Sequence, residues 1–273
     1  MEKIRKPAVA GYFYPGNPQS LKKEISLMLD ITKPEKAYEK IFGIVSPHAG
    51  YIYSGKTASY GFNLLLNKNY ETVIIISPSH REYFPGSCIY EGTAYETPLG
   101  KLKINETMSQ KICDGSKTIF RGVKGHGDEH AVEVQLPFLQ SVLKDFSIVP
   151  VVMGDQGKPF IDELAAQISN SVDEKTLIVA SSDLSHYYNR IKANSMDSIV
   201  EKNINEFDYD SLIRNLESGK CEACGGGPIA VMMKAAEILN YSKSKVLNRN
   251  DSGETSGDLN QVVGYLSAVV YGE

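Results

Sequence analysis

Three apolar segments of the chain each end in a histidine: "IVSPHAGY", "IIISPSHREY" and "IVASSDLSHYY". They place His48, His80 and His186 just beyond runs typical of buried strands, with Asp183 at the end of the third run. Because the functional crevice of an open parallel sheet lies outside the carboxyl ends of its strands, we expect these side chains to meet at one edge. A lone histidine at a strand end is more often a loop residue that bonds a backbone carbonyl. Here three of the 5 histidines follow strand-like runs, and this recurrence favours a chemical site.

A cysteine pair supplies a further candidate, in the stretch "CEACGGGPIAVMM". Cys221 and Cys224 come just before a predicted helix, with Pro228 at its first turn. A thiolate near a helix amino end has a lowered pKa and can bind a metal or react. One Cys-x-x-Cys is weak, since a structural zinc needs four ligands, so Cys221 is more simply a free thiol, whereas Cys224 is evenly balanced. The glycines 225–227 could form an anion-binding nest or only allow a tight turn.

Two more histidines lie in "GHGDEHAVEVQLPF", immediately before another predicted helix. His130 adjoins that helix, and Asp128 is a candidate for its cap. His126 sits among glycines, which predicts an exposed loop without a chemical role.

The stretch from Gly50 to Thr57, "GYIYSGKT", formally matches the phosphate-binding loop G-x-x-x-x-G-K-[ST]. A phosphate loop begins where its strand stops, and here Ser-Pro-His-Ala intervenes. Its inner residues are Tyr-Ile-Tyr-Ser, bulky types that resist the curl needed to point successive N–H groups inward. A nucleotide site is therefore disfavoured, and the glycines are better explained as turns around His48.

The elements that must position these residues alternate between strand and helix. Strands buried on both faces are predicted at 41–46, 72–77, 146–153 and 176–182. Helices are predicted at 57–68, 131–144 (kinked or divided by Pro137) and 159–172, a hairpin end and helix within 96–115, and late strands at 244–251 and 261–272. This pattern predicts one α/β domain over 1–273, with a mainly parallel or mixed central sheet, its last strand antiparallel, and helices on both faces.

Composition limits the classes of protein that remain. The 273 residues are 42% hydrophobic and 23% charged, with a net charge of −4 and scattered basic residues, so no nucleic-acid partner is expected. No apolar run reaches the ~20 residues of a membrane helix, and the first residues lack a signal-peptide core. We therefore expect a cytoplasmic protein whose 4 cysteines form no disulfides.

Five motifs in this order resemble the Memo family, the B component of the AmmeMemoRadiSam group: "SPHAGYIYSG", "ISPSH", "DEHAVEVQLPF", "SSDLSHY" and "CGGGPIAV". The opening "RKPAVAGYFYPGNPQSL" is similar as well, so the resemblance covers essentially the whole chain. It implies a fold similar to that of the class III extradiol, or LigB-like, dioxygenases, with a metal site at the sheet edge.

Motif by motif, the resemblance implies metal ligands at three residues: His48, His80 and Cys224. It places Asp183 and His186 beside the metal, with His186 matching the acid–base histidine of the dioxygenases, a ring that a carboxylate such as Asp183 could orient on chemical grounds. It also places His130 in the same pocket. The dioxygenases proper have a carboxylate where this family has cysteine, and Cys221 adds a second thiol that could be a ligand or a redox partner.

Three kinds of function follow from such a site. Iron or copper would favour an oxidoreductase acting with O₂ on a small organic substrate. Zinc would favour a hydrolase or lyase with a metal-bound water. A pocket holding a metal or a peptide without turnover is the third, with tyrosines such as Tyr53 and Tyr187 as candidate lining. The family also implies a functional link to radical-SAM and AMMECR1-like proteins.

Overall fold

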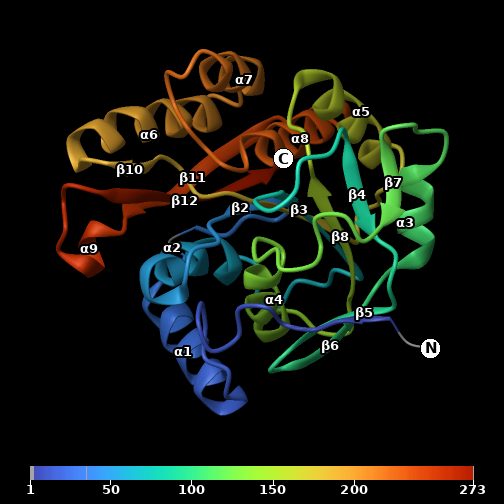
Figure 1. Ribbon diagram of the computed structural model, residues 1–273, viewed down its shortest axis with the longest axis horizontal. Coiled ribbons are helices and arrows are strands. Elements are labelled where there is room, and N and C mark those ends of the chain that lie inside the picture. Colours follow the sequence, from blue (N-terminus) through green and yellow to red (C-terminus); the bar gives the residue numbers. More distant parts are fainter. Residues whose placement is uncertain (1–2, 35, 273) are drawn as a thin grey trace.

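The computed structural model describes residues 3–34 and 36–272, which form one α/β domain around a nine-stranded sheet (Figure 1). Its strands are β2 (Ile41–Ser46), β3 (Thr72–Pro78), β4 (Ser87–Tyr90), β7 (Ile119–Gly122), β8 (Ser147–Met153), β9 (Thr176–Ser181), β10 (His186–Tyr188), β11 (Lys243–Asp251) and β12 (Val262–Tyr271). Eight of them follow the order β10-β12-β2-β9-β3-β8-β4-β7, and β11 also pairs with β12.

The four central strands, β2, β9, β3 and β8, are mutually parallel and almost wholly buried. Their continuous apolar sequences reflect this, because both faces of the sheet are covered. The strands β12 and β4 run antiparallel to β2 and β8, so the sheet is mixed. The predicted sheet is thus confirmed, including its antiparallel last strand.

Helices cover both faces of the sheet (Figure 1). One face carries α1 (Pro18–Ile31), α2 (Tyr51–Asn63) and α4 (Leu136–Val142). The other carries α3 (Glu106–Cys113), α5 (Lys158–Ser169), α6 (Arg190–Asn205), α7 (Tyr209–Glu217) and α8 (Gly226–Ile238). Alternate residues of each strand serve the two cores: Ile75 packs on the first side, and Ile74 and Ile76 pack on the second.

The remaining elements lie around this three-layer core. They are the small sheet of β1 (Ile4–Arg5), β5 (Ala94–Thr97) and β6 (Gly100–Lys103), the 3₁₀ helix η1 (Glu133–Gln135) and the short α9 (Gly253–Ser256). The predicted hairpin end and helix within 96–115 correspond to β5, β6 and α3. Among the described helices, none combines the length and apolar character that crossing a bilayer requires.

Helix boundaries differ most from the sequence-based expectation in α2 and α4. The helix predicted from residue 57 begins at Tyr51, because that aromatic side chain is buried against Tyr14 and Phe138. The helix predicted over 131–144 is divided: η1 is followed by α4, with Pro137 in the first turn of α4. Proline fits there because a first-turn N–H has no intrahelical partner.

Candidate metal centre

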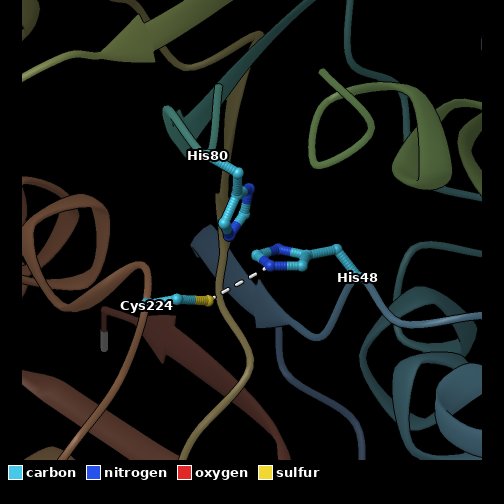
Figure 2. A group of neighbouring side chains, drawn as sticks. All are labelled: His48, His80 and Cys224. Atoms are coloured by element: carbon cyan, nitrogen blue, oxygen red, sulfur yellow. Dashed lines mark hydrogen bonds between the residues drawn. The ribbon is translucent and has the colours of Figure 1, made fainter. Parts of the chain in front are cut away.

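Three side chains from distant parts of the chain converge at the carboxyl edge of the sheet. His48 follows β2, His80 follows β3, and Cys224 lies two residues before α8 (Figure 2). One donor atom from each lies within 4.8 Å of the other two, and His48 Nε2 is 3.1 Å from Cys224 Sγ. The two imidazole rings are nearly perpendicular, with centroids 5.1 Å apart. The structure therefore brings together the three ligands that the family resemblance implied.

Hydrogen bonds fix which nitrogen of His48 is free. Its Nδ1 lies 2.8 Å from Ser181 Oγ, the side chain at the end of the neighbouring strand β9. Ser181 donates its hydroxyl proton to the Ala131 carbonyl at 2.7 Å, so it must accept from the ring. Burial, and then the nearby His80, lower the pKa of His48 to about 3, so the ring is neutral. The lone pair of His48 therefore lies on Nε2, facing Cys224.

Glu129 does the same for His80. Its carboxylate accepts from His80 Nδ1 at 2.9 Å and from the His80 backbone N–H at 2.6 Å. Burial alone would raise the pKa of Glu129, but the hydrogen bonds that it accepts from His80 and Ala131 outweigh this effect and hold that pKa at about 2. Because a carboxylate can only accept, the proton of His80 lies on Nδ1 and its other nitrogen is left free, turned toward His48 and Cys224 (Figure 2).

Sequence reasoning missed Glu129. It stands directly before His130 in "DEH", where Asp128 attracted attention as a helix cap. Glu129 also accepts from the backbone N–H groups of His130 and Ala131, at 2.9 and 3.0 Å. Its only signal in the sequence was an acidic side chain beside a histidine.

Cys224 is held by its close approach to the end of β9. A Cβ on Gly225 would lie 2.1 Å from the Ser181 carbonyl oxygen, so only glycine fits after the cysteine. The Gly225 N–H donates to Ser182 Oγ at 2.9 Å, and the Gln156 amide donates to the Cys224 carbonyl at 2.7 Å. The glycine run therefore serves close packing at this thiol, where the sequence had left open an anion nest or a tight turn.

Asp183 supports the loop that carries His48. Its Oδ1 accepts from the His48 backbone N–H at 2.7 Å, and its own N–H points to Cys224 Sγ at 3.2 Å. No hydrogen bond joins it to the ring of His186 among the residues described. Burial raises the pKa of Asp183. The carboxylate therefore braces the His48 loop, where we expected it to orient the His186 ring.

The other two histidines of the expected site lie nearby. The His130 ring is 5.3 Å from that of His48 and 4.9 Å from that of His80, and it packs on Phe13. His186 is half-buried in β10, and lines with Cys224 a cavity of about 520 Å³. Both can therefore reach a molecule beside the cluster.

His126 has a different environment from the one predicted. It is 1% exposed, not in an exposed loop. Its Nδ1 bonds the Tyr95 hydroxyl at 2.7 Å, and its Nε2 bonds the Cys88 carbonyl at 3.0 Å. The prediction of exposure is wrong because the loop packs closely on the core at Gly125, where a Cβ would lie 2.6 Å from the Val152 side chain. Both ring nitrogens are used, so His126 has a structural part only.

The phosphate-loop interpretation is excluded by the geometry of α2. The helix starts at Tyr51, so "YIYSGKT" is helical and its backbone N–H groups are not turned toward a common point. The N–H of Tyr51 donates to the Phe13 carbonyl, and those of Tyr53 and Ser54 donate to the Gly50 carbonyl. These groups are unavailable to a phosphate.

The donor set of the cluster fits a transition-metal ion. Two imidazoles present ring nitrogens toward a half-buried thiol, a set typical of copper, zinc and iron sites. Burial, and then Asp183, raise the pKa of Cys224 well above its usual range. Throughout residues 3–34 and 36–272, no lysine or arginine side chain bonds to Cys224 or Asp183. A bound cation would supply the positive charge that this thiol and carboxylate lack.

The fold and the cluster define an α/β protein of LigB-like architecture with a candidate metal centre at the carboxyl edge of its sheet. A family model described as "Memo-like protein" matches residues 5–269. The chain belongs to the Memo family.

Similar proteins come from archaea and bacteria. A MEMO1 family protein of Thermoplasma volcanium is 38% identical over 267 residues, covering 97% of this chain and 98% of the relative. Another from Nitrosopumilus maritimus is 36% identical, covering 96% of this chain and 98% of the relative. Among solved structures, an uncharacterized protein of Escherichia coli K12 superimposes with a TM-score of 0.56 at 12% identity, covering 84% of this chain and 98% of that one. That last likeness concerns the fold alone.

Proposed function

We propose that this chain binds a redox-active transition-metal ion, iron or copper, through His48, His80 and Cys224, and acts as an oxidoreductase on a small organic substrate. One observation carries the proposal: the hydrogen bonds of Ser181 and Glu129 leave a free nitrogen on each imidazole, and both nitrogens lie within 4.8 Å of the sulfur. A buried histidine that serves only the fold, such as His126, has both nitrogens occupied by protein groups, whereas the Nε2 of buried His48 faces only the Cys224 sulfur.

Three protein ligands leave further positions for substrate, as in the facial arrangement of non-haem iron oxygenases. Iron or copper would supply one-electron chemistry with O₂. Thiolate is a softer ligand than the carboxylate of the dioxygenases, which favours copper more strongly than their site does.

The surrounding residues bind, orient and exchange protons. His186 lies at the cavity beside Cys224, where an imidazole can give a proton to a bound molecule or take one from it. His130 lies on the other side, against the rings of His48 and His80. Asp183 keeps the His48 loop in place through its bond to the backbone N–H.

Anaerobic purification followed by elemental analysis tests the metal centre. We expect about one iron or copper per chain, and a metal affinity at least about a hundredfold lower after Cys224→Ala, since a metal ligand is lost. Cys113→Ala is the matched control, because Cys113 is a half-buried thiol at the end of α3, outside the cluster. Equal affinities for the two variants would refute the assignment of Cys224.

An oxygen electrode then separates the kinds of chemistry. Uptake of O₂ that depends on an organic substrate, and that is lost in Cys224→Ala, is the expected result. Stoichiometric zinc with a flat oxygen trace would reject the oxidoreductase, and would favour a hydrolase or a pocket without turnover.

A further inference from the structure

The cavity beside Cys224 has an apolar wall. It occupies about 520 Å³ among α5, α7, α8 and the start of β10. Ile161 and Ile213 line it and are themselves buried, and Leu216 lines it while half-buried. Small-molecule sites have about this volume and are mostly apolar with a few polar groups. The cavity can therefore take a molecule the size of one substituted ring.

The polar lining of this cavity includes two carboxylates, beside the Gln156 amide and the His186 imidazole. Glu217, at the end of α7, is exposed, and Glu222 lies half-buried two residues before Cys224. Glu222 accepts a hydrogen bond from the Tyr188 hydroxyl at 2.5 Å, and neither glutamate forms an ion pair within the described part of the chain. Among residues 3–34 and 36–272, no lysine or arginine lines the cavity. Two unpaired carboxylates would repel an organic anion and attract an organic cation.

The positions of the lining groups indicate how a bound molecule would be oriented in the cavity. Cys224 and His186 lie on its lining together, so the group that reacts would be placed against them. The carboxylates of Glu217 and Glu222 lie on the same lining, available to the charged group of the same molecule. The apolar wall would cover the part between.

We propose that this cavity is the substrate end of the metal centre and takes a small organic amine, with its ammonium group facing Glu217 and Glu222 and its apolar body on Ile161, Ile213 and Leu216. The proposal rests on the function assigned above, and it adds the class of substrate. It predicts that the cavity binds amines in preference to carboxylates of the same shape.

The test compares two ligands of nearly equal size, phenethylamine and 3-phenylpropanoate, by titration calorimetry at low ionic strength. Both are titrated into Co²⁺-loaded and metal-free protein. The thiolate absorption bands of bound Co²⁺ report independently whether the ligand lies beside Cys224. In the metal-free protein we expect the amine to bind at least about tenfold more tightly than the acid, because the acid meets two like charges there.

Charge reversal at the rim sharpens the test. Glu217→Lys should weaken amine binding by about fivefold and strengthen binding of the acid, since the side chain is exposed and its charge partly screened. Glu174→Lys is the matched control: it is also exposed, but it precedes β9 at the opposite edge of the sheet. It should change neither affinity by more than about twofold.

The outcomes distinguish this inference from the function on which it rests. The proposal is overturned if the acid binds metal-free protein as tightly as the amine does, if neither ligand binds, or if Glu217→Lys leaves the preference unchanged. Co²⁺ loading with no amine binding would reject the amine and leave the metal centre standing. Amine binding to protein that takes up no metal would reject the metal centre instead.

Discussion

Two buried glutamates four residues apart, Glu129 and Glu133, show how one residue type serves different ends. They are 2% and 0% exposed, and each accepts several hydrogen bonds. Glu133 pairs with Arg5, accepts from the Tyr14 hydroxyl at 2.5 Å, and accepts from the backbone of Ala8 and Val9 at 2.8 and 3.0 Å. All these groups are fully used, so the network closes on itself.

The partners of Glu129 are different. It fixes the proton of His80 on one ring nitrogen, and thereby leaves the other nitrogen free within the cluster. Its own backbone carbonyl is held by Arg5, so the two networks touch. Both glutamates are therefore buried and hydrogen-bonded, and they differ in their partners. The partners of Glu133 use all their donor groups, whereas His80, the partner of Glu129, keeps one ring nitrogen that no other group of the described residues bonds. The closed network serves stability, whereas the open one leaves His80 the ring nitrogen that we propose as a metal ligand.

The largest effect is expected at Glu133. Glu133→Gln would leave the buried Arg5 guanidinium without its counter-charge, at a cost of about 3–5 kcal/mol in the free energy of unfolding. Urea denaturation measures it. The metal affinity of the folded variant should stay within about twofold of the wild-type value, because none of the three proposed metal ligands, all of them described residues, bonds to Glu133. Glu71→Gln is the control: Glu71 pairs with Lys175 in an exposed ion pair, so its loss should cost less than about 1 kcal/mol. A hundredfold loss of metal affinity with unchanged stability would reverse the comparison.

A third buried carboxylate, Asp197, has fewer donors and extends the comparison to pH. Burial, only partly offset by hydrogen bonds from Ser185, raises its pKa from 3.8 to about 6. A raised carboxyl pKa contributes stability that is complete below the unfolded value and is lost as the pH rises through the folded one.

We therefore expect the wild type to lose about 2 kcal/mol of unfolding free energy relative to Asp197→Asn as the pH rises from 4 to 7. Urea denaturation across this range gives both curves, and the difference isolates Asp197 from other titrating groups. Parallel curves would show that Asp197 is as well satisfied as Glu133.

The smallest change in free energy is expected at Glu129, and it falls on a different property. Glu129→Gln keeps the size of the side chain but weakens the hold on the His80 ring, so metal affinity should fall by about tenfold. Competition with a chelator measures it. Glu163→Gln is the matched control, since Glu163 accepts from Ser116 and Thr118 away from the cluster. An unchanged affinity in Glu129→Gln would place Glu129 in the same class as Glu133.

The central sheet could be predicted because its signal is local. Strands such as β3 and β9 are continuous apolar runs, and Ser-Pro marks the ends of two strands that carry histidines. The convergence of His48 and His80 followed from parallel strands ending at one edge. Joining Cys224 to them needed the family resemblance, because one Cys-x-x-Cys has little specificity.

The supporting residues could not be predicted, because their signal is tertiary. Arg5 and Glu133 are 128 residues apart, and nothing in either neighbourhood points to the other. Tyr51 has a β-favouring neighbourhood, yet it starts a helix because Tyr14 and Phe138 bury it. His126 was misjudged for the same reason, since its glycines gave no sign of the Tyr95 hydroxyl and Cys88 carbonyl that satisfy its ring.

The placement of β2 between β9 and β12 has a consequence for biosynthesis. The ribosome releases β2 early, but both of its neighbours in the sheet are translated much later. The strand that carries His48 therefore has no partner at either edge until those later segments are made. Only then can Ser181 orient the His48 ring and Cys224 lie opposite it. All three proposed ligands are present together only after most of the chain has been made, so the proposed metal ion could be bound by the full set only late in biosynthesis.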